Sequence, residues 1–220
     1  RFEWKNIRTK EFELFHEDCT FTDDSVMTIA VAKALHESKK KRYADLEKQL
    51  DFWMHQIGKR YPFCGFGGRF FEWIMNDNAE PYNSFGNGSG MRTSECAWIA
   101  ESLKEVLSLA ERCASVTHNH PEGIKGAKAT AACIFLARNG CSKEQIRDYV
   151  EEKYHYDLHK SMKEIVSRGH GQEICQISVP QAIICFLHSD SFIDTIRKAV
   201  SIGGDSDTLA CIGGSIAEAY

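Results

Sequence analysis

Residues 21–35 read FTDDSVMTIAVAKAL, a polar cluster that leads directly into an apolar run. The apolar residues recur at i, i+3, i+4 and i+8 counted from Val26, which is the spacing of one face of a helix. Asp23 and Asp24 come just before this run, at or near the position that caps a helix N-terminus. The stretch predicts a helix over 25–35 that begins beside two carboxylates.

Helical spacing recurs along most of the chain. We expect further helices over 46–57, from Gly68, and over 95–110, 121–138, 143–152, 180–187, 191–200 and 207–220. Strand-like alternation is confined to the short segments 11–15 and 175–179. No Gly/Ser-rich or Pro-rich linker divides the chain, so the sequence predicts one compact all-α domain over residues 1–220.

Composition narrows the class of protein. Hydrophobic residues make up 43% and charged residues 26% of the 220, which is ordinary globular usage. No apolar run reaches the roughly 18 residues of a membrane span, and a net charge of -4 argues against a nucleic-acid partner. We expect no membrane association, no nucleic-acid partner and a monomer. The one compact basic run, Lys39 to Arg42, is expected to be a solvated helix end.

The cysteines indicate the location of the protein, and the two ends of the sequence indicate a longer natural chain. Nine cysteines, an odd number without a CxxC pair, favour reduced and mostly buried thiols in a cytoplasmic protein. The chain begins at Arg1 rather than at methionine, and it ends within a helical pattern at Tyr220. We expect both ends to be trimmed relative to a longer natural chain.

A second acidic cluster, Asp205-Ser206-Asp207-Thr208, follows two glycines and opens another predicted helix. Capping explains one acid at each helix start but not two, because adjacent carboxylates repel unless a positive charge lies between them. Aspartate and threonine oxygens suit hard cations such as Mg²⁺ or Mn²⁺. If the two clusters meet, four carboxylates balance two divalent ions. The residues alone therefore predict either two capping motifs or one metal site of a hydrolase.

Two polar loops are candidates for binding a substrate. Residues 84–92, SFGNGSGMR, contain three glycines in five residues, which lets backbone amides approach a ligand such as a phosphate. Residues 117–121, THNHP, lead into a predicted helix and carry two histidines. By themselves such loops are more often ordinary helix entries. Without a cysteine at zinc-site spacing, the second loop does not predict a zinc site.

Four segments in chain order resemble the signatures of the ADP-ribosylglycohydrolase family, which includes the dinitrogenase-reductase-activating glycohydrolases. They are FTDDSVMT (21–28), SFGNGSGMR (84–92), THNHPEGIKGA (117–127) and GGDSDTLACIGGSIAEAY (203–220). The opening Arg1-Phe2-Glu3-Trp4 resembles the end of that family's N-terminal segment. The resemblance implies a compact all-α fold around two Mg²⁺ or Mn²⁺ ions. It also implies a hydrolase that cleaves the N- or O-glycosidic bond between ADP-ribose and a modified protein or small molecule.

The resemblance also implies roles for individual residues. The metal ligands that it implies are Thr22, Asp23, Asp24, Asp205, Asp207 and Thr208. The catalytic residues that it implies are Glu3, Asp23, Asp24 and Asp207, and the substrate-binding residues are Asn87, Gly88, Ser89, Met91 and His118. Which carboxylate is the general base, and whether the acceptor is arginine, serine, a polymer or a small molecule, stays open.

Two alternatives remain at this point. One is a family member that binds ADP-ribose or serves as a structural protein without catalysis, although such a protein has no reason to keep all four aspartates. The other is a metal-dependent phosphohydrolase, which would release phosphate rather than ADP-ribose.

Overall fold

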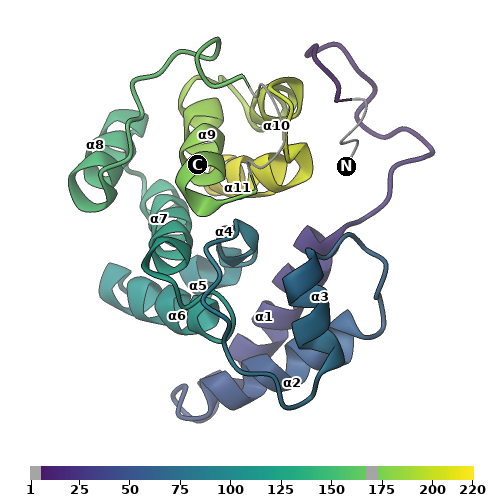
Figure 1. Ribbon diagram of the computed structural model, residues 1–220. Coiled ribbons are helices and arrows are strands. Elements are labelled where there is room, and N and C mark those ends of the chain that lie inside the picture. The colour runs from purple at the N-terminus through teal and green to yellow at the C-terminus, as the bar shows by residue number, and fades with distance from the viewer. Residues whose placement is uncertain (1–5, 167–172) are drawn as a thin grey trace.

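The computed structural model describes residues 6–166 and 173–220, and in these ranges the chain forms eleven α-helices (Figure 1). They are α1 (Asp23–Lys39), α2 (Leu46–Gly58), α3 (Gly68–Met75), α4 (Gly88–Met91), α5 (Ser94–Ile99), α6 (Leu103–Ser115), α7 (Pro121–Arg138), α8 (Lys143–Tyr154), α9 (Cys175–Leu187), α10 (Phe192–Ser201) and α11 (Ser206–Ala219). Among the described residues the only β-pairing is an isolated bridge between Gly86 and Ile174. The predicted all-α class is confirmed.

Helix α7 forms the centre of the fold. Ten of its eighteen residues are buried, most of them glycine or alanine, and it packs against α4, α5, α6, α8, α9 and α11. Small side chains let the neighbouring segments come close. A Cβ added to Gly123 would lie 2.6 Å from the Ser84 carbonyl oxygen and 2.8 Å from that of His118. The residues of α7 therefore bring both polar loops against the first turn of this helix.

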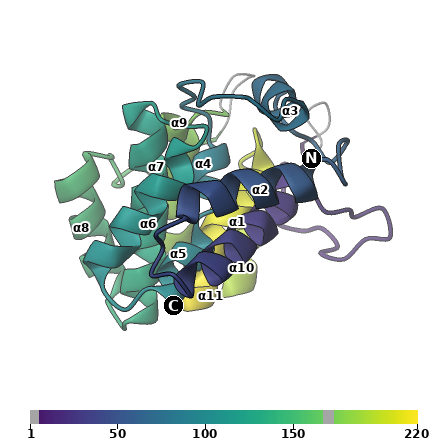
Figure 2. The same ribbon diagram turned by 90° about the horizontal axis from the view of Figure 1, so that it is seen from below.

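Six of the other helices flank α7 in two groups. Helices α1, α2 and α3 lie together, and α9, α10 and α11 form the second group (Figures 1 and 2). Within the groups, α1 packs on α2, and α11 packs on both α9 and α10. The start of α1 and the start of α11 face each other between the groups, and this arrangement positions the acidic clusters.

Two of the expected elements differ in the structure. The helix expected over 95–110 is divided into α5 and α6, because Ala100 is extended (ψ 151°) and the Ser102 hydroxyl accepts a capping hydrogen bond from the Glu105 amide. The strand expected over 175–179 is wrong. These residues begin α9, so Pro180 lies inside that helix rather than at its start.

The other short strand, expected over 11–15, is also absent, and that segment contains only bends and turns. Trp98 is 44% exposed, because it lies on the outer side of the short α5 and stacks with the guanidinium of Arg138. Phe70 and Trp73 are buried.

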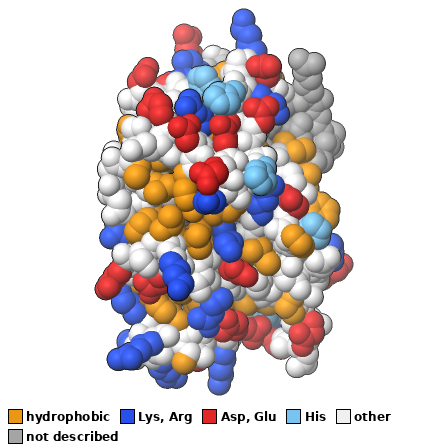
Figure 3. Space-filling view, turned by 90° about the vertical axis from the view of Figure 1, so that its left-hand side faces the viewer, with side chains coloured by type: hydrophobic (Ala, Val, Ile, Leu, Met, Phe, Trp, Pro, Cys, Tyr) orange, Lys and Arg blue, Asp and Glu red, His pale blue; other side chains and the backbone are white. Residues whose placement is uncertain are grey.

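One surface expectation is confirmed. The basic run from Lys39 to Arg42 is exposed at the end of α1. Residues of both charge signs are interspersed around an apolar area on the face that includes α8 (Figure 3). Among the described residues, no helix combines the length and the apolar character that a membrane crossing requires. All nine cysteines are free, and five of them are buried.

Candidate functional site

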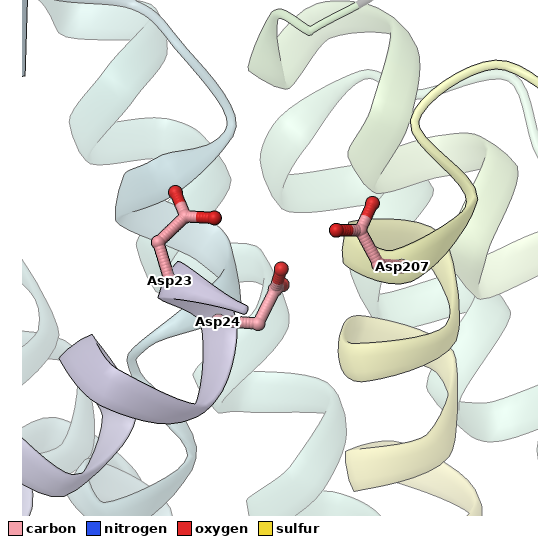
Figure 4. Close-up of side chains that lie close together, drawn as sticks. All are labelled: Asp23, Asp24 and Asp207. Carbon is pink, nitrogen blue, oxygen red and sulfur yellow. The ribbon is translucent and has the colours of Figure 1, made fainter. Parts of the chain in front are cut away.

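The two acidic clusters meet in space. Asp23 and Asp24 lie in the first turn of α1, and Asp207 lies in the first turn of α11. Their side chains point toward one another across the gap between the helices (Figure 4). One carboxylate oxygen from each lies within 4.8 Å of the other two. Residues from the two ends of the sequence therefore form one three-carboxylate cluster.

Capping does not account for these acids. The N-cap residues are Thr22 for α1 and Asp205 for α11, and neither side chain makes a capping hydrogen bond. The Thr22 hydroxyl instead donates to Asp24 Oδ2 at 2.9 Å. Among the described residues, the buried oxygens Asp24 Oδ1 and Asp207 Oδ1 have no hydrogen-bond partner. A buried carboxylate oxygen without a donor is costly, so these two oxygens suit a positively charged ligand.

The pKa of Asp24 also indicates a site that suits a positively charged ligand. Burial, followed by the negative charge of Asp207, raises the pKa of Asp24 from 3.8 to about 7, with a smaller contribution from Asp205. Hydrogen bonds from Thr22 and Thr208 act in the opposite direction. This donor set of carboxylate and hydroxyl oxygens fits a hard divalent cation. The residues present thus match the cation type that the sequence predicts.

A turn with left-handed glycines presents the second cluster. Gly203 and Gly204 have φ values of +75° and +73°, a conformation that favours glycine, and the chain then enters α11 at Asp205. The N-terminal segment holds this turn. Asn6 Nδ2 donates to the Gly204 carbonyl at 3.2 Å, and Arg8 Nη1 donates to the Ile202 carbonyl at 2.7 Å.

Sequence reasoning missed Asn6 and Arg8, because nothing in their local pattern indicates a partner at the far end of the chain. The predicted catalytic residue Glu3 lies outside the described residues.

A cavity of about 370 Å³ opens beside the clusters. Seven of the predicted site residues line it, namely Asp23, Asn87, Gly88, Met91, His118, Asp205 and Thr208. Thr22, Asp24 and Asp207 do not line it. Ser89 is fully buried, and its hydroxyl donates to the Gly123 carbonyl at 2.8 Å. Ser89 does not line the cavity either.

The same cavity has a positively charged part that the sequence analysis did not identify. Arg69 and Arg92 both line it. Arg69 lies at the start of α3, and its guanidinium stacks on the ring of Tyr82, 4.7 Å from the ring centre. Arg92 is 1% exposed, and its Nε and Nη1 have no hydrogen-bond partner among the described residues. Burial lowers the pKa of Arg92 to about 10, so it stays charged at neutral pH.

His118 connects this charged part to the glycine-rich loop. Its Nδ1 lies 2.7 Å from the Thr117 hydroxyl, which also accepts a hydrogen bond from Arg92 Nη2 at 2.7 Å. Its Nε2 would lie 3.3 Å from a Cβ on Gly88, so only glycine leaves the ring in place. Burial and then the charges of Arg92 and Arg69 lower the pKa of His118 well below its usual value. The ring is therefore neutral near pH 7.

The glycine-rich loop is anchored to the start of α9. The backbone amide of Asn87 donates to the Glu173 carbonyl at 3.0 Å, and the Cys175 amide donates to the Phe85 carbonyl at 3.0 Å. The Asn87 side chain reaches in the other direction, to Asp205 Oδ2 at 2.8 Å and to the Ser178 hydroxyl at 3.0 Å. The loop and the second acidic cluster are thus in direct contact. Ser178 had no signal in the sequence.

Comparisons with known proteins agree with this arrangement. The ADP-ribosylglycohydrolase family model matches residues 1–220. The ADP-ribosylhydrolase ARH3 of Mus musculus is 28% identical, over 93% of this chain and 70% of its own length. The ADP-ribosylarginine hydrolase Tri1 of Pseudomonas putida is 26% identical, over 90% of this chain and 58% of its own length.

A solved structure, an ADP-ribosylglycohydrolase-related protein complex, superimposes with a TM-score of 0.71 at 25% identity, covering 91% of this chain and 71% of that chain. The family match over the whole chain confirms the resemblance carried by the four motifs. The chain belongs to the ADP-ribosylglycohydrolase family.

Proposed function

We propose that this protein is a metal-dependent hydrolase that cleaves the N- or O-glycosidic bond between ADP-ribose and a modified acceptor. The observation that carries the proposal is the three-carboxylate cluster, with two buried oxygens that lack a hydrogen-bond partner among the described residues. Such a cluster beside a cavity with arginines and a glycine-rich loop suits a substrate with both ribose hydroxyls and phosphates. Family membership supplies the reaction class.

Two divalent ions, Mg²⁺ or Mn²⁺, are the proposed cofactors. Their proposed ligands are Thr22, Asp23, Asp24, Asp205, Asp207 and Thr208. When bound, such ions polarise substrate oxygens and make a nearby water more acidic. Without them, the repulsion that raises the pKa of Asp24 disfavours the ionised cluster.

The proposed chemistry takes place at the anomeric carbon of the ribose nearest the carboxylates. Departure of the acceptor leaves positive charge on that sugar, in an oxocarbenium-like transition state. The carboxylates stabilise that charge, and one of Asp23, Asp24, Asp207 or Glu3 accepts the proton of the attacking water. The departing acceptor takes up a proton in turn, so that ADP-ribose and the free acceptor are released. Asp23 is the member of the three-carboxylate cluster that lines the cavity, so it has the most direct access to substrate.

The other half of the substrate lies along the charged part of the cavity. In this proposal, Gly88, Met91 and His118 contact the ligand directly, and Ser89 supports the loop through its hydrogen bond to the Gly123 carbonyl. The diphosphate lies near Arg69, where a Cβ on Gly67 or Gly68 would meet nothing within 4 Å. Backbone amides of glycine residues at the start of a helix, next to an arginine, favour the binding of an anion. This orientation directs the scissile bond toward the acidic clusters.

We further infer that residues 1–220 form one domain, since one hydrophobic core includes residues from α1 to α11. The proposed substrate is an ADP-ribosylated protein or small molecule, acted on by a monomer. Nine free cysteines favour a reducing, cytoplasmic location.

Release of ADP-ribose from a panel of defined ADP-ribosylated substrates tests the proposal. The wild-type protein should be active with Mg²⁺ or Mn²⁺ and inactive after chelation, and added metal should restore activity. Asp24→Asn and Asp205→Asn should remain folded but release no ADP-ribose, while the exposed Asp18→Asn serves as the control for loss of one carboxylate. Turnover at the wild-type rate by either site variant, with metal saturating, would refute the two-metal assignment. Release of phosphate instead of ADP-ribose would refute the reaction.

A further inference from the structure

The side chain of Asn87 uses both of its amide hydrogens inside the protein. Nδ2 donates to Asp205 Oδ2 at 2.8 Å and to the Ser178 hydroxyl at 3.0 Å. The three residues are 6%, 8% and 1% exposed, respectively. An ionised carboxylate only accepts hydrogen bonds, so the Asp205 contact fixes which end of the amide faces it. Asn87 has no amide hydrogen left to offer a phosphate.

We propose that Asn87 and Ser178 are positioning residues that hold the Asp205 carboxylate for metal binding, and that Asn87 does not bind the substrate through its amide group. This inference rests on the proposed metal-dependent function. It changes the role that the family resemblance implies for Asn87, and it assigns a role to Ser178.

The chemistry of the site explains why an amide suits this position. Asp205 lies close enough to Asp24 for its charge to raise the pKa of that residue. A lysine or arginine bonded to Asp205 would neutralise the charge that attracts a cation. A neutral amide restrains one oxygen of the carboxylate without cancelling its charge.

Helix α9 fixes Asn87 from two directions. Its side chain bonds to Ser178 in the first turns of α9, and its backbone amide bonds to Glu173, just before that helix. The adjacent bridge between Gly86 and Ile174 adds a third connection. Asn87 is therefore held by a rigid element while it holds Asp205. Orientation of a ligand by such hydrogen bonds typically changes metal affinity by roughly 10–100-fold.

A double-mutant cycle on Mn²⁺ binding tests the proposal. The full chain is titrated with Mn²⁺ without substrate, and free Mn²⁺ is followed by electron paramagnetic resonance. Asn87→Ala should weaken binding roughly 10–100-fold. Ser178→Ala should weaken it roughly 2–10-fold, the range of one neutral hydrogen bond. The double variant should bind like Asn87→Ala, because Ser178 acts only through Asn87.

The matched control is Ser38→Ala. Ser38 is also fully buried and also donates to an aspartate, Asp45, at 2.8 Å, but neither residue lines the cavity. It should leave Mn²⁺ affinity unchanged. Circular dichroism identifies any variant that does not fold, and the milder Ser178→Ala keeps the test valid if Asn87→Ala unfolds.

The outcomes separate this inference from the function itself. Unchanged Mn²⁺ affinity in both Asn87→Ala and Ser178→Ala, with weaker binding of ADP-ribose, would overturn the positioning role and restore the direct one. Additive effects of the two substitutions would also overturn it. Because no turnover is measured, a wrong reaction class would leave the cycle unaffected, whereas a wild-type protein that binds no Mn²⁺ would refute both proposals.

Discussion

Replacing Asp24 with asparagine should stabilise the metal-free protein at alkaline pH while it removes activity. The pKa of Asp24 is raised from 3.8 to about 7, chiefly by burial and by Asp207. An acid with a raised pKa binds its proton more tightly in the folded protein. The contribution of Asp24 to stability is therefore greatest below pH 3.8 and falls as the pH rises to about 7. The full shift corresponds to about 4 kcal/mol.

The asparagine variant avoids this ionisation but carries its own cost. Its carbonyl oxygen can still accept the hydrogen bond that the Thr22 hydroxyl donates to Asp24. Its amide hydrogens are buried without acceptors, at a cost of roughly 1–3 kcal/mol. Asp24→Asn should thus be less stable than wild type near pH 4. It should be more stable by roughly 1–3 kcal/mol at pH 8, the difference between these two effects.

Urea denaturation in the presence of a chelator, at pH 4 and at pH 8, measures this change of sign. The exposed Asp18→Asn removes one carboxylate elsewhere and should show no such pH dependence. Adding Mn²⁺ at pH 8 should stabilise wild type and not Asp24→Asn. If Asp24→Asn lowers stability equally at both pH values, then Asp24 is not destabilised by its charged surroundings, and the argument for a cation at this site fails.

Three further substitutions test other parts of the structure. Gly123→Ala should lower the free energy of unfolding by roughly 1–3 kcal/mol in urea titrations, because its Cβ would lie 2.6 Å from the Ser84 carbonyl oxygen. A variant as stable as wild type would mean that the contact between α7 and residue 84 is looser than described. Ser142→Ala should lower the free energy of unfolding by about 1 kcal/mol in the same assay, because it removes the capping box with Gln145 at the start of α8. An accompanying loss of activity would contradict the placement of α8 away from the site. Arg69→Ala should raise KM for an ADP-ribosylated substrate roughly tenfold, with kcat little changed and a weaker dependence of KM on salt. An unchanged KM would show that Arg69 is not part of the proposed diphosphate site.

The acidic clusters were readable in the sequence because each one sits beside a strong local signal for a helix start. Asp23 was expected just before one predicted helix and Asp207 at the start of another. The structure places both in the first turn of their helices and brings them together. The helix boundaries were harder to predict from the sequence where a single side chain determines them. The break between α5 and α6 depends on the Ser102 cap, and Pro180 lies within α9, where apolar residues on several sides made the segment resemble a short strand.

The residues that sequence reasoning missed act through contacts between distant segments. Arg69 belongs to no motif quoted from the sequence, and only the fold brings it into the same cavity as Asp205. Ser178 is one of three polar residues in the largely apolar α9, and such a residue usually indicates nothing beyond packing. Asn87 was recognised, but from its loop alone the partner of its side chain could not be known.

The hydrogen bonds that complete the site join positions far apart along the chain. Asn6 and the Gly204 carbonyl are separated by 198 positions, and Asn87 and Asp205 by 118. Helix pairs such as α1 with α2, α6 with α7 and α10 with α11 involve neighbours in sequence and need no such closure.

Contacts between distant positions carry a larger loop-closure entropy and form more slowly than local ones. During synthesis, the turn at 202–204 leaves the ribosome well after Asn6 and Arg8. On refolding, helical structure should therefore appear before metal binding, and a nascent chain would acquire a working site only after residues 202–208 have been synthesised.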